Sequence, residues 1–277
     1  MNKFEQGTNR LDKVSKILGP ELNTAIQNIF GESQTLHLVE NVYKDYPMMA
    51  RVAAAKSDEE LLALYQTAAK NITNINSENF HENALTDLSQ KLYDASYGFI
   101  AKNPKLNHIR GQWNNATIEQ RKDFCNAVVD NLSKAFDVPR PELFFQTGRQ
   151  LPVNGFSYDG TIFMNIGNDS GALGLIVHEF THHLQSHDKT PMGHDAVHKT
   201  RENYVLSAFL PADKRDKFHD FVFKNIYSNS LLEREAIFTG NWVKQHFREM
   251  QNRTQSEKTQ TPDVMLKINE ALNGRSV

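Results

Sequence analysis

Cysteine, long apolar runs and a large net charge are all scarce or missing in this chain. One cysteine among 277 residues excludes an intrachain disulfide and is typical of proteins from a reducing compartment. Cys125 lies in an apolar helical segment, which favours a buried hydrophobic role over a nucleophilic one. The formal net charge of −2 gives no electrostatic reason to expect a nucleic acid or an anionic membrane as the main partner.

The apolar segments argue against two further classes of protein. Residues 1–7 contain no apolar core of the kind that Sec signal peptides have, so we expect no such signal. The apolar run at 171–177 is far shorter than the ~20 residues that a membrane-spanning helix needs. We therefore expect a protein without a membrane span that is cytoplasmic, or exported by a route that needs no signal.

Hydrophobic periodicity divides the chain into three regions. Residues 1–115 predict a helical region without a recognisable site, and the capping box at 57–60 opens one of its helices. Residues 116–250 combine helices with strands. Residues 251–277 predict a polar linker followed by one last helix. We expect two polar, asparagine-rich connections within the first region, at residues 71–79 and 103–115.

The pattern changes from helical to extended in the middle region. A second capping box at 117–120 opens a helix, and 142–147 predicts a strand that follows two prolines. Asp159-Gly160 is a two-residue hairpin signal between strands expected at 156–158 and 161–166. The prediction is an α+β fold that is mostly α, in which a small antiparallel or mixed sheet leads directly into the next helix.

That next helix carries the pattern His-Glu-x-x-His, in His178-Glu179-Phe180-Thr181-His182. Residues four apart share one helix face, so His178 and His182 could present their ring nitrogens to a single ion. Glu179 lies about 100° around the helix, where it can reach a metal-bound water without being a ligand. The pattern predicts two metal ligands and a general base, and it requires a third ligand from elsewhere. The alternative is a surface helix with incidental histidines.

Glu235 is the first candidate for the third ligand. Large apolar residues share its helix face, so we expect its carboxylate to point toward a packed interior, where a metal ion would be a suitable partner. Glu233 lies about 200° away, on the side of smaller and more polar residues, and ranks behind Glu235. The alternative for Glu235 is an ion pair with a neighbour such as Arg234 or Arg248.

Asp188 is a second candidate because some zincins take their third ligand ten residues after the first histidine, beyond a sharp turn. The glycine expected at that turn is replaced here by Gln185, which disfavours the left-handed backbone that the turn needs. Asp188 therefore ranks below Glu235, and His187 and His194 rank lower still.

The His-Glu-x-x-His pattern, followed by Glu233-Arg234-Glu235-Ala236, resembles the gluzincin branch of the zincin metallopeptidases. The preceding order of helix, strand, hairpin and helix is similar to the minimal zincin core, and the first region lies outside the resemblance. The resemblance implies that His178, His182 and Glu235 bind one zinc ion and that Glu179 is the general base. The implied activity is hydrolysis of a peptide or protein substrate by a zinc-activated water.

Such a mechanism needs a second donor for the oxyanion, and the candidates are His194, His198, Tyr204 and His246. Two other functions stay open. One is a metal-stabilised binding or regulatory protein that has the zincin core without peptidase activity, and the intact Glu179 argues against it. The other is an effector or toxin peptidase that is exported without a signal.

Overall fold

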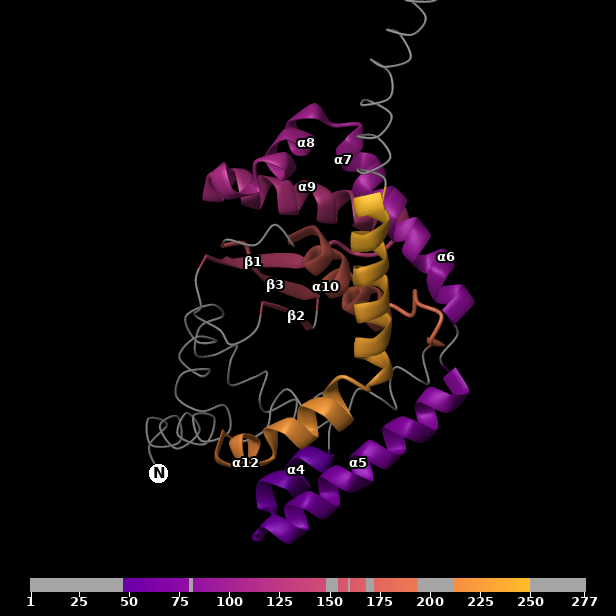
Figure 1. The fold of residues 1–277 in the computed structure, drawn as a ribbon, viewed down its shortest axis with the longest axis vertical. Coiled ribbons are helices and arrows are strands. Elements are labelled where there is room, and N and C mark those ends of the chain that lie inside the picture. The colour runs from indigo at the N-terminus through magenta and orange to yellow at the C-terminus, as the bar shows by residue number, and fades with distance from the viewer. Residues whose placement is uncertain are drawn as a thin grey trace, which may run out of the picture.

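Helices surround one small sheet in the computed structural model (Figure 1). The structure describes residues 47–79, 82–147, 154–158, 160–167, 172–193 and 212–249. Several predictions fall outside these residues. They are the polar linker and helix at 251–277 and the candidate residues His194, His198 and Tyr204.

The first described helices are α4 (Pro47–Ala54) and α5 (Asp58–Asn79). Ser57 caps α5, because its hydroxyl accepts a hydrogen bond of 3.2 Å from the backbone N–H of Glu60. The connection predicted at 71–79 is wrong, since α5 continues through it. Ile72 is fully buried there, and this packing outweighs the weak helix propensity of the asparagines around it.

The second predicted connection, at 103–115, is also helical. The chain first runs through α6 (Glu82–Tyr93), the π-helix η1 (Asp94–Gly98) and α7 (Phe99–Ala101). Asn103 then caps α8 (Pro104–Gly111), accepting a hydrogen bond of 3.3 Å from Leu106 N–H, with Pro104 in the first turn. A short 3₁₀ helix, η2 (Trp113–Asn115), follows. The polar residues that suggested a loop therefore include the cap of a helix.

The helix α9 (Ile118–Phe136) begins at the predicted capping box. Both of its hydrogen bonds are present, from Gln120 N–H to the Thr117 hydroxyl and from Thr117 N–H to the Gln120 side chain. The helix ends at Asp137, whose φ of 52° is left-handed. This end turns the chain toward the sheet.

The sheet has three strands, β1 (Glu142–Gln146), β2 (Gly155–Tyr158) and β3 (Thr161–Asn165). Their order is β1-β3-β2, with β3 parallel to β1 and antiparallel to β2. Gly160, at φ 74°, lies in the predicted hairpin turn. The mixed sheet and the mostly helical α+β class are confirmed, and β2 is an edge strand of this sheet.

Within the described ranges, three helical elements follow the sheet. They are α10 (Ala172–Ser186), α12 (Ala212–Val222), which runs on into the π-helix η3 (Phe223–Tyr227), and a helix at 231–249. The last of these, orange to yellow in Figure 1, runs past one end of the sheet and of α10. The helix that carries the histidines is thereby covered by the helix that carries both candidate glutamates.

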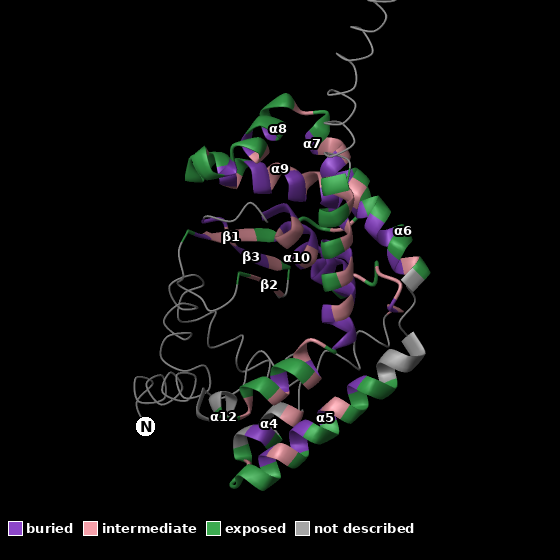
Figure 2. Cartoon of the chain, in the orientation of Figure 1, coloured by how far each residue is buried: buried purple, intermediate pink, exposed green. Residues whose placement is uncertain are grey.

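Two buried clusters hold the described elements together (Figure 2). The larger one joins α6 to α9, the sheet, α10 and Val243, and the smaller one joins α4 and α5 to Val222 and Ile226. The domain boundary expected near residue 115 separates neither cluster, because each draws on residues from both sides of it. The first region is thus part of the packing around the later elements.

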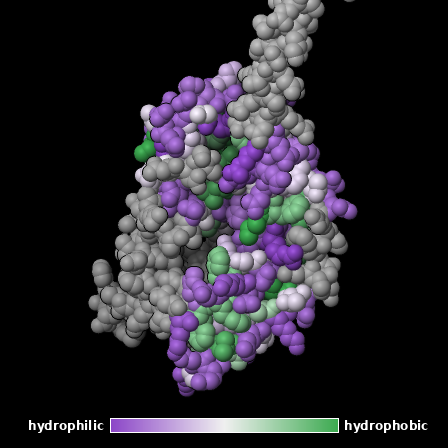
Figure 3. Space-filling view, in the orientation of Figure 1, coloured by the Kyte–Doolittle hydropathy of each residue, from purple (hydrophilic) through white to green (hydrophobic). Residues whose placement is uncertain are grey.

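The described surface is mostly polar. On the face in Figure 3, hydrophilic residues predominate and hydrophobic ones form small separate patches. None of the helices in the described ranges is long and apolar enough to span a bilayer.

Helix 231–249 approaches α10 closely through two glycines. A Cβ on Gly240 would lie 3.2 Å from the Gly174 carbonyl oxygen and 3.5 Å from the His178 Cβ. Further along, the buried hydroxyls of Thr181 and Thr239 are 2.8 Å apart. Small side chains therefore set the distance between the two helices.

Replacing Gly240 by leucine should force these helices apart. We expect Gly240→Leu to lower the free energy of unfolding by about 1–3 kcal/mol, because no space exists for the larger side chain. Urea denaturation measures this. Asn241→Leu, at the exposed neighbouring position, is the matched control and should change stability little. Equal stability of Gly240→Leu and the wild type would contradict the packing described.

Candidate metal centre

His178, Glu179 and His182 form one cluster on α10. Their ligand-type atoms all lie within 4.8 Å of one another, and the two imidazole rings are 4.9 Å apart between centroids. The His178 side chain is 20% exposed and that of His182 only 7%, so the cluster opens to solvent on the His178 side. This group could hold a metal ion.

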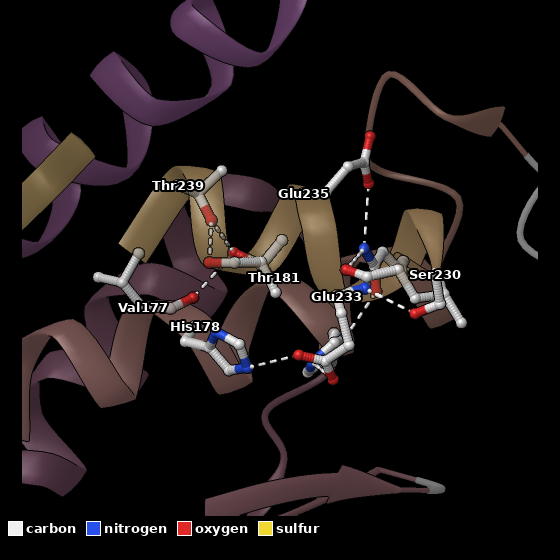
Figure 4. A network of polar contacts seen from close by, with 11 residues as sticks. Val177, His178, Thr181, Ser230, Glu233, Glu235 and Thr239 are labelled. Carbon is white, nitrogen blue, oxygen red and sulfur yellow. Dashed lines mark hydrogen bonds and ion pairs between the residues drawn. The ribbon is translucent and has the colours of Figure 1, made fainter. Parts of the chain in front are cut away.

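Glu233 contacts both imidazoles from the opposite helix (Figure 4). Its carboxylate oxygens lie 3.5 Å from His178 Nε2 and 3.2 Å from His182 Nε2. Ligands of a tetrahedral zinc ion at ~2.0–2.1 Å are about 3.3 Å from one another. The two nitrogen–oxygen distances are therefore close to the spacing of ligands around such an ion, and each imidazole faces a different oxygen of the carboxylate.

The start of helix 231–249 places this carboxylate. The Ser230 hydroxyl accepts a hydrogen bond of 3.3 Å from Glu233 N–H, so Glu233 lies in the first turn of the helix. The positive end of the helix dipole favours a carboxylate at that position. The side chain of Glu233 turns to the imidazoles, and it is 1% exposed.

The electrostatics of the cluster are those of a buried ion pair. Burial, reinforced by His182, lowers the pKa of His178 to about 4. Burial also disfavours the charged form of His182, but the Glu233 carboxylate outweighs it and raises the pKa of His182 to about 9. Burial would raise the pKa of Glu233, yet the two imidazoles hold it below its ordinary value. A metal ion would take the place of the proton on His182.

Glu179 is a buried carboxyl group held against the edge strand. Burial, together with the charge of Glu233, raises the pKa of Glu179 to about 8, while His182 acts in the opposite direction. Among the described residues, its Oε2 atom has no hydrogen-bond partner. A Cβ on Gly155 would lie 2.6 Å from Glu179 Oε1, so only glycine leaves room for this carboxyl group beside β2. Buried polar atoms without a partner are uncommon in folded proteins, so this oxygen marks Glu179 as a candidate functional group.

Glu235 does not face the ring nitrogens. Its carboxylate accepts a hydrogen bond of 3.0 Å from Gln185 Nε2, and in Figure 4 it points away from His178. Burial raises the pKa of Glu235 to about 6, against the effect of the hydrogen bond from Gln185. The geometry therefore places Glu233, and not Glu235, against the two imidazoles.

The physical reason lies in the sizes of the side chains on that helix. The large apolar residues near Glu235 indicated the buried face, but the stripe of Glu233, Ala236 and Gly240 is buried as well, because small residues allow α10 to come close. The pattern Ser230-x-x-Glu233, a capping-box signature, was the sequence signal that places Glu233 in the first turn.

The other candidates within the described residues lie outside the cluster. Asp188 occupies the turn after α10, at a left-handed φ of 55°. The His187 ring packs against His183, with 4.4 Å between centroids. His246 stacks on Trp242 at 4.5 Å. None of the three belongs to the group that could hold the ion.

Tyr227 is a site residue that the sequence did not indicate. Its hydroxyl hydrogen-bonds the Glu233 carboxylate, and burial together with that carboxylate raises the pKa of Tyr227, so the phenol stays protonated. Tyr227 is the last residue of the π-helix η3. The wider spacing of a π turn changes which face a residue occupies, and helical periodicity gives no signal for it.

Comparisons with protein-family models, with curated proteins and with solved structures found no match to this chain. The geometry of the cluster is therefore the basis for any assignment of function.

Removal of Glu233 should abolish tight metal binding. After the proteins are loaded with zinc and the free ion is removed by dialysis, we expect wild type to retain one zinc ion per chain and Glu233→Ala to lose it. The two imidazoles alone make a weak site. Elemental analysis of the dialysed proteins measures this. Asp188→Ala is the control and should keep one ion per chain. Full zinc content in Glu233→Ala would rule Glu233 out as a ligand.

Proposed function

We propose that this chain is a zinc-dependent metallopeptidase in which His178, His182 and Glu233 bind one zinc ion. The observation that carries the proposal is the buried Glu233 carboxylate, whose two oxygens lie 3.5 Å and 3.2 Å from the Nε2 atoms of His178 and His182, close to the spacing of ligands around a zinc ion. When bound, the ion would supply a water of pKa near ~7 and polarise a carbonyl group. The likeness to gluzincins belongs to this proposal, with Glu233 in place of Glu235.

Glu179 is the proposed general base. Its pKa of about 8 lies near neutral pH, where a group can both accept and return a proton. Its unpaired Oε2 atom is available to a water molecule beside the two imidazoles. Glu179 would take the proton of the attacking water and deliver it to the leaving amine, so that the carboxyl group ends in its starting state.

Tyr227 is the proposed donor to the oxyanion. The phenol is protonated and hydrogen-bonds Glu233, so it lies next to a proposed metal ligand. In this role the O–H group would turn from the Glu233 carboxylate to the carbonyl oxygen, where a donor in a buried site stabilises the negative charge that forms. Of the four donors that the sequence suggested, His246 stacks on Trp242, and His194, His198 and Tyr204 lie outside the described residues.

The edge strand β2 is the proposed binding surface for an extended peptide. It lies at the edge of the sheet, and Gly155 at its start is in contact distance of Glu179. A peptide that adds to an exposed strand edge is held by main-chain hydrogen bonds, which do not depend on its sequence. A bound peptide would thus have a backbone carbonyl group near the base.

The central test is Glu179→Gln. We expect a loss of peptide hydrolysis of about 10²–10⁴-fold, because the amide cannot accept the proton, while one zinc ion per chain is retained. Cleavage of a quenched peptide library and zinc analysis of the same sample measure the two properties. Hydrolysis at the wild-type rate would overturn the mechanism. Loss of zinc together with activity would indicate that Glu179 is a metal ligand.

Gly155→Ala tests the placement of the base. The new Cβ would meet the Glu179 carboxyl group at 2.6–3.0 Å and displace it, so we expect hydrolysis to fall by roughly 10- to 10²-fold with zinc content unchanged. Gly98→Ala, where nothing lies within 4 Å of the added methyl group, is the matched control. Full activity of Gly155→Ala would show that the position of Glu179 is not critical.

A purely structural metal site is the second candidate. The observation in its favour is that Glu179, as well as Glu233, is close enough to the imidazoles to serve as a fourth ligand, which would close the site. Removal of the metal distinguishes the two functions. A structural site predicts a large loss of folding stability, whereas a catalytic site predicts lost hydrolysis with the fold retained.

A further inference from the structure

Gln185 is a buried amide whose polar atoms are all engaged. The side chain is 1% exposed and connects α10 to helix 231–249. Its Nε2 atom lies 2.9 Å from the Leu232 carbonyl oxygen and 3.0 Å from Glu235 Oε2. Its Oε1 atom lies 2.8 Å from His182 Nδ1.

These partners fix the orientation of the amide. A backbone carbonyl can only accept a hydrogen bond, so the amide nitrogen must face Leu232 and Glu235. The amide oxygen therefore faces His182, and because it can only accept, the hydrogen must be on His182 Nδ1. The Nε2 atom of His182, which faces Glu233, is left as the ligand atom.

Glu235 fixes the position of the Gln185 amide. Its carboxylate holds one amide hydrogen of Gln185 and also accepts a hydrogen bond from the backbone of Met192, in the segment after α10. The buried carboxylate thus links the histidine-bearing helix, the segment that follows it and helix 231–249. This accounts for a buried acidic residue that does not face the metal site.

The two histidines are oriented by different means. The backbone of Ala236 hydrogen-bonds His178, and no substitution of a side chain removes that partner. His182 depends on the side chains of Gln185 and Glu235. Of the two, only His182 depends on side chains for the hydrogen bond at its other ring nitrogen.

We propose that Gln185 and Glu235 are positioning residues that hold His182 in the tautomer that binds the metal through Nε2. The proposal rests on the metal binding of the proposed function and is independent of peptide hydrolysis. Partners of this kind orient ligand imidazoles, and their removal commonly weakens metal affinity by ~10- to 100-fold.

Gln185→Leu removes the partner of His182 with little change of volume. We expect zinc affinity, measured by competition with a chromophoric chelator, to fall about 10- to 100-fold. In the zinc-loaded protein, the slowly exchanging Nδ1–H signal of His182 in ¹⁵N NMR spectra should disappear, because the hydrogen loses its buried acceptor. An effect on packing alone would not alter that signal.

The position of Glu235 provides a matched pair of variants. Glu235→Leu removes the acceptor of the Gln185 amide and should weaken zinc binding in the same direction as Gln185→Leu. Glu235→Gln keeps an acceptor oxygen at the same place and should bind zinc nearly as well as wild type. Thr181→Val removes one hydroxyl of the buried pair that joins α10 to helix 231–249, and it should lower stability without changing zinc affinity or the Nδ1–H signal.

Two outcomes separate this inference from the proposed function. If wild type binds zinc tightly and Gln185→Leu binds it equally well with an intact Nδ1–H signal, the positioning role is wrong and the metal site stands. If wild type binds no zinc, the proposed function itself fails and the inference fails with it. If Glu235→Gln and Glu235→Leu weaken zinc binding equally, the hydrogen bond from the Gln185 amide is not the cause of the weaker binding.

Discussion

The close approach of α10 to helix 231–249 is the constraint on which the candidate site depends. One carboxylate reaches two imidazoles only because Gly174 and Gly240 let the helices come into near contact. The same approach buries the polar groups and removes them from water, which strengthens each charge interaction. The glycines that allow the two helices to pack closely therefore also strengthen the charge interactions between the imidazoles and the carboxylate.

The local features of the site could be read from the sequence, and the contacts between elements could not. His178, Glu179 and His182 follow from helical spacing, and the hairpin at Gly160 follows from its turn residues, because both depend on neighbours in the chain. The choice of Glu233 over Glu235 depends on which face packs against α10. The sizes of the residues determine which face of helix 231–249 packs against α10, and the prediction considered only how hydrophobic each face is.

The elements outside the site show the same limit. The asparagine-rich segments were expected to be connections, because asparagine has low helix propensity and favours turns. Burial of Ile72 and the cap formed by Asn103 make both segments helical. A buried cluster crosses the expected boundary near residue 115, since Leu85 and Trp113 pack into the same cluster as Phe124 and Val177. A segment without a recognisable motif can still be part of the core that supports one.

The π-helix η3 sets the direction of Tyr227 through the number of residues in one turn. A π turn contains about one residue more than an α turn, so Tyr227 lies roughly 100° short of the position that an α-helical count would give. Deletion of one residue of η3 with a return to α-helical spacing would leave the phenol at nearly its present angle, because the π turn has absorbed the extra residue. The segment should therefore tolerate the loss of one residue more readily than a further insertion, which would rotate the phenol by about 100°.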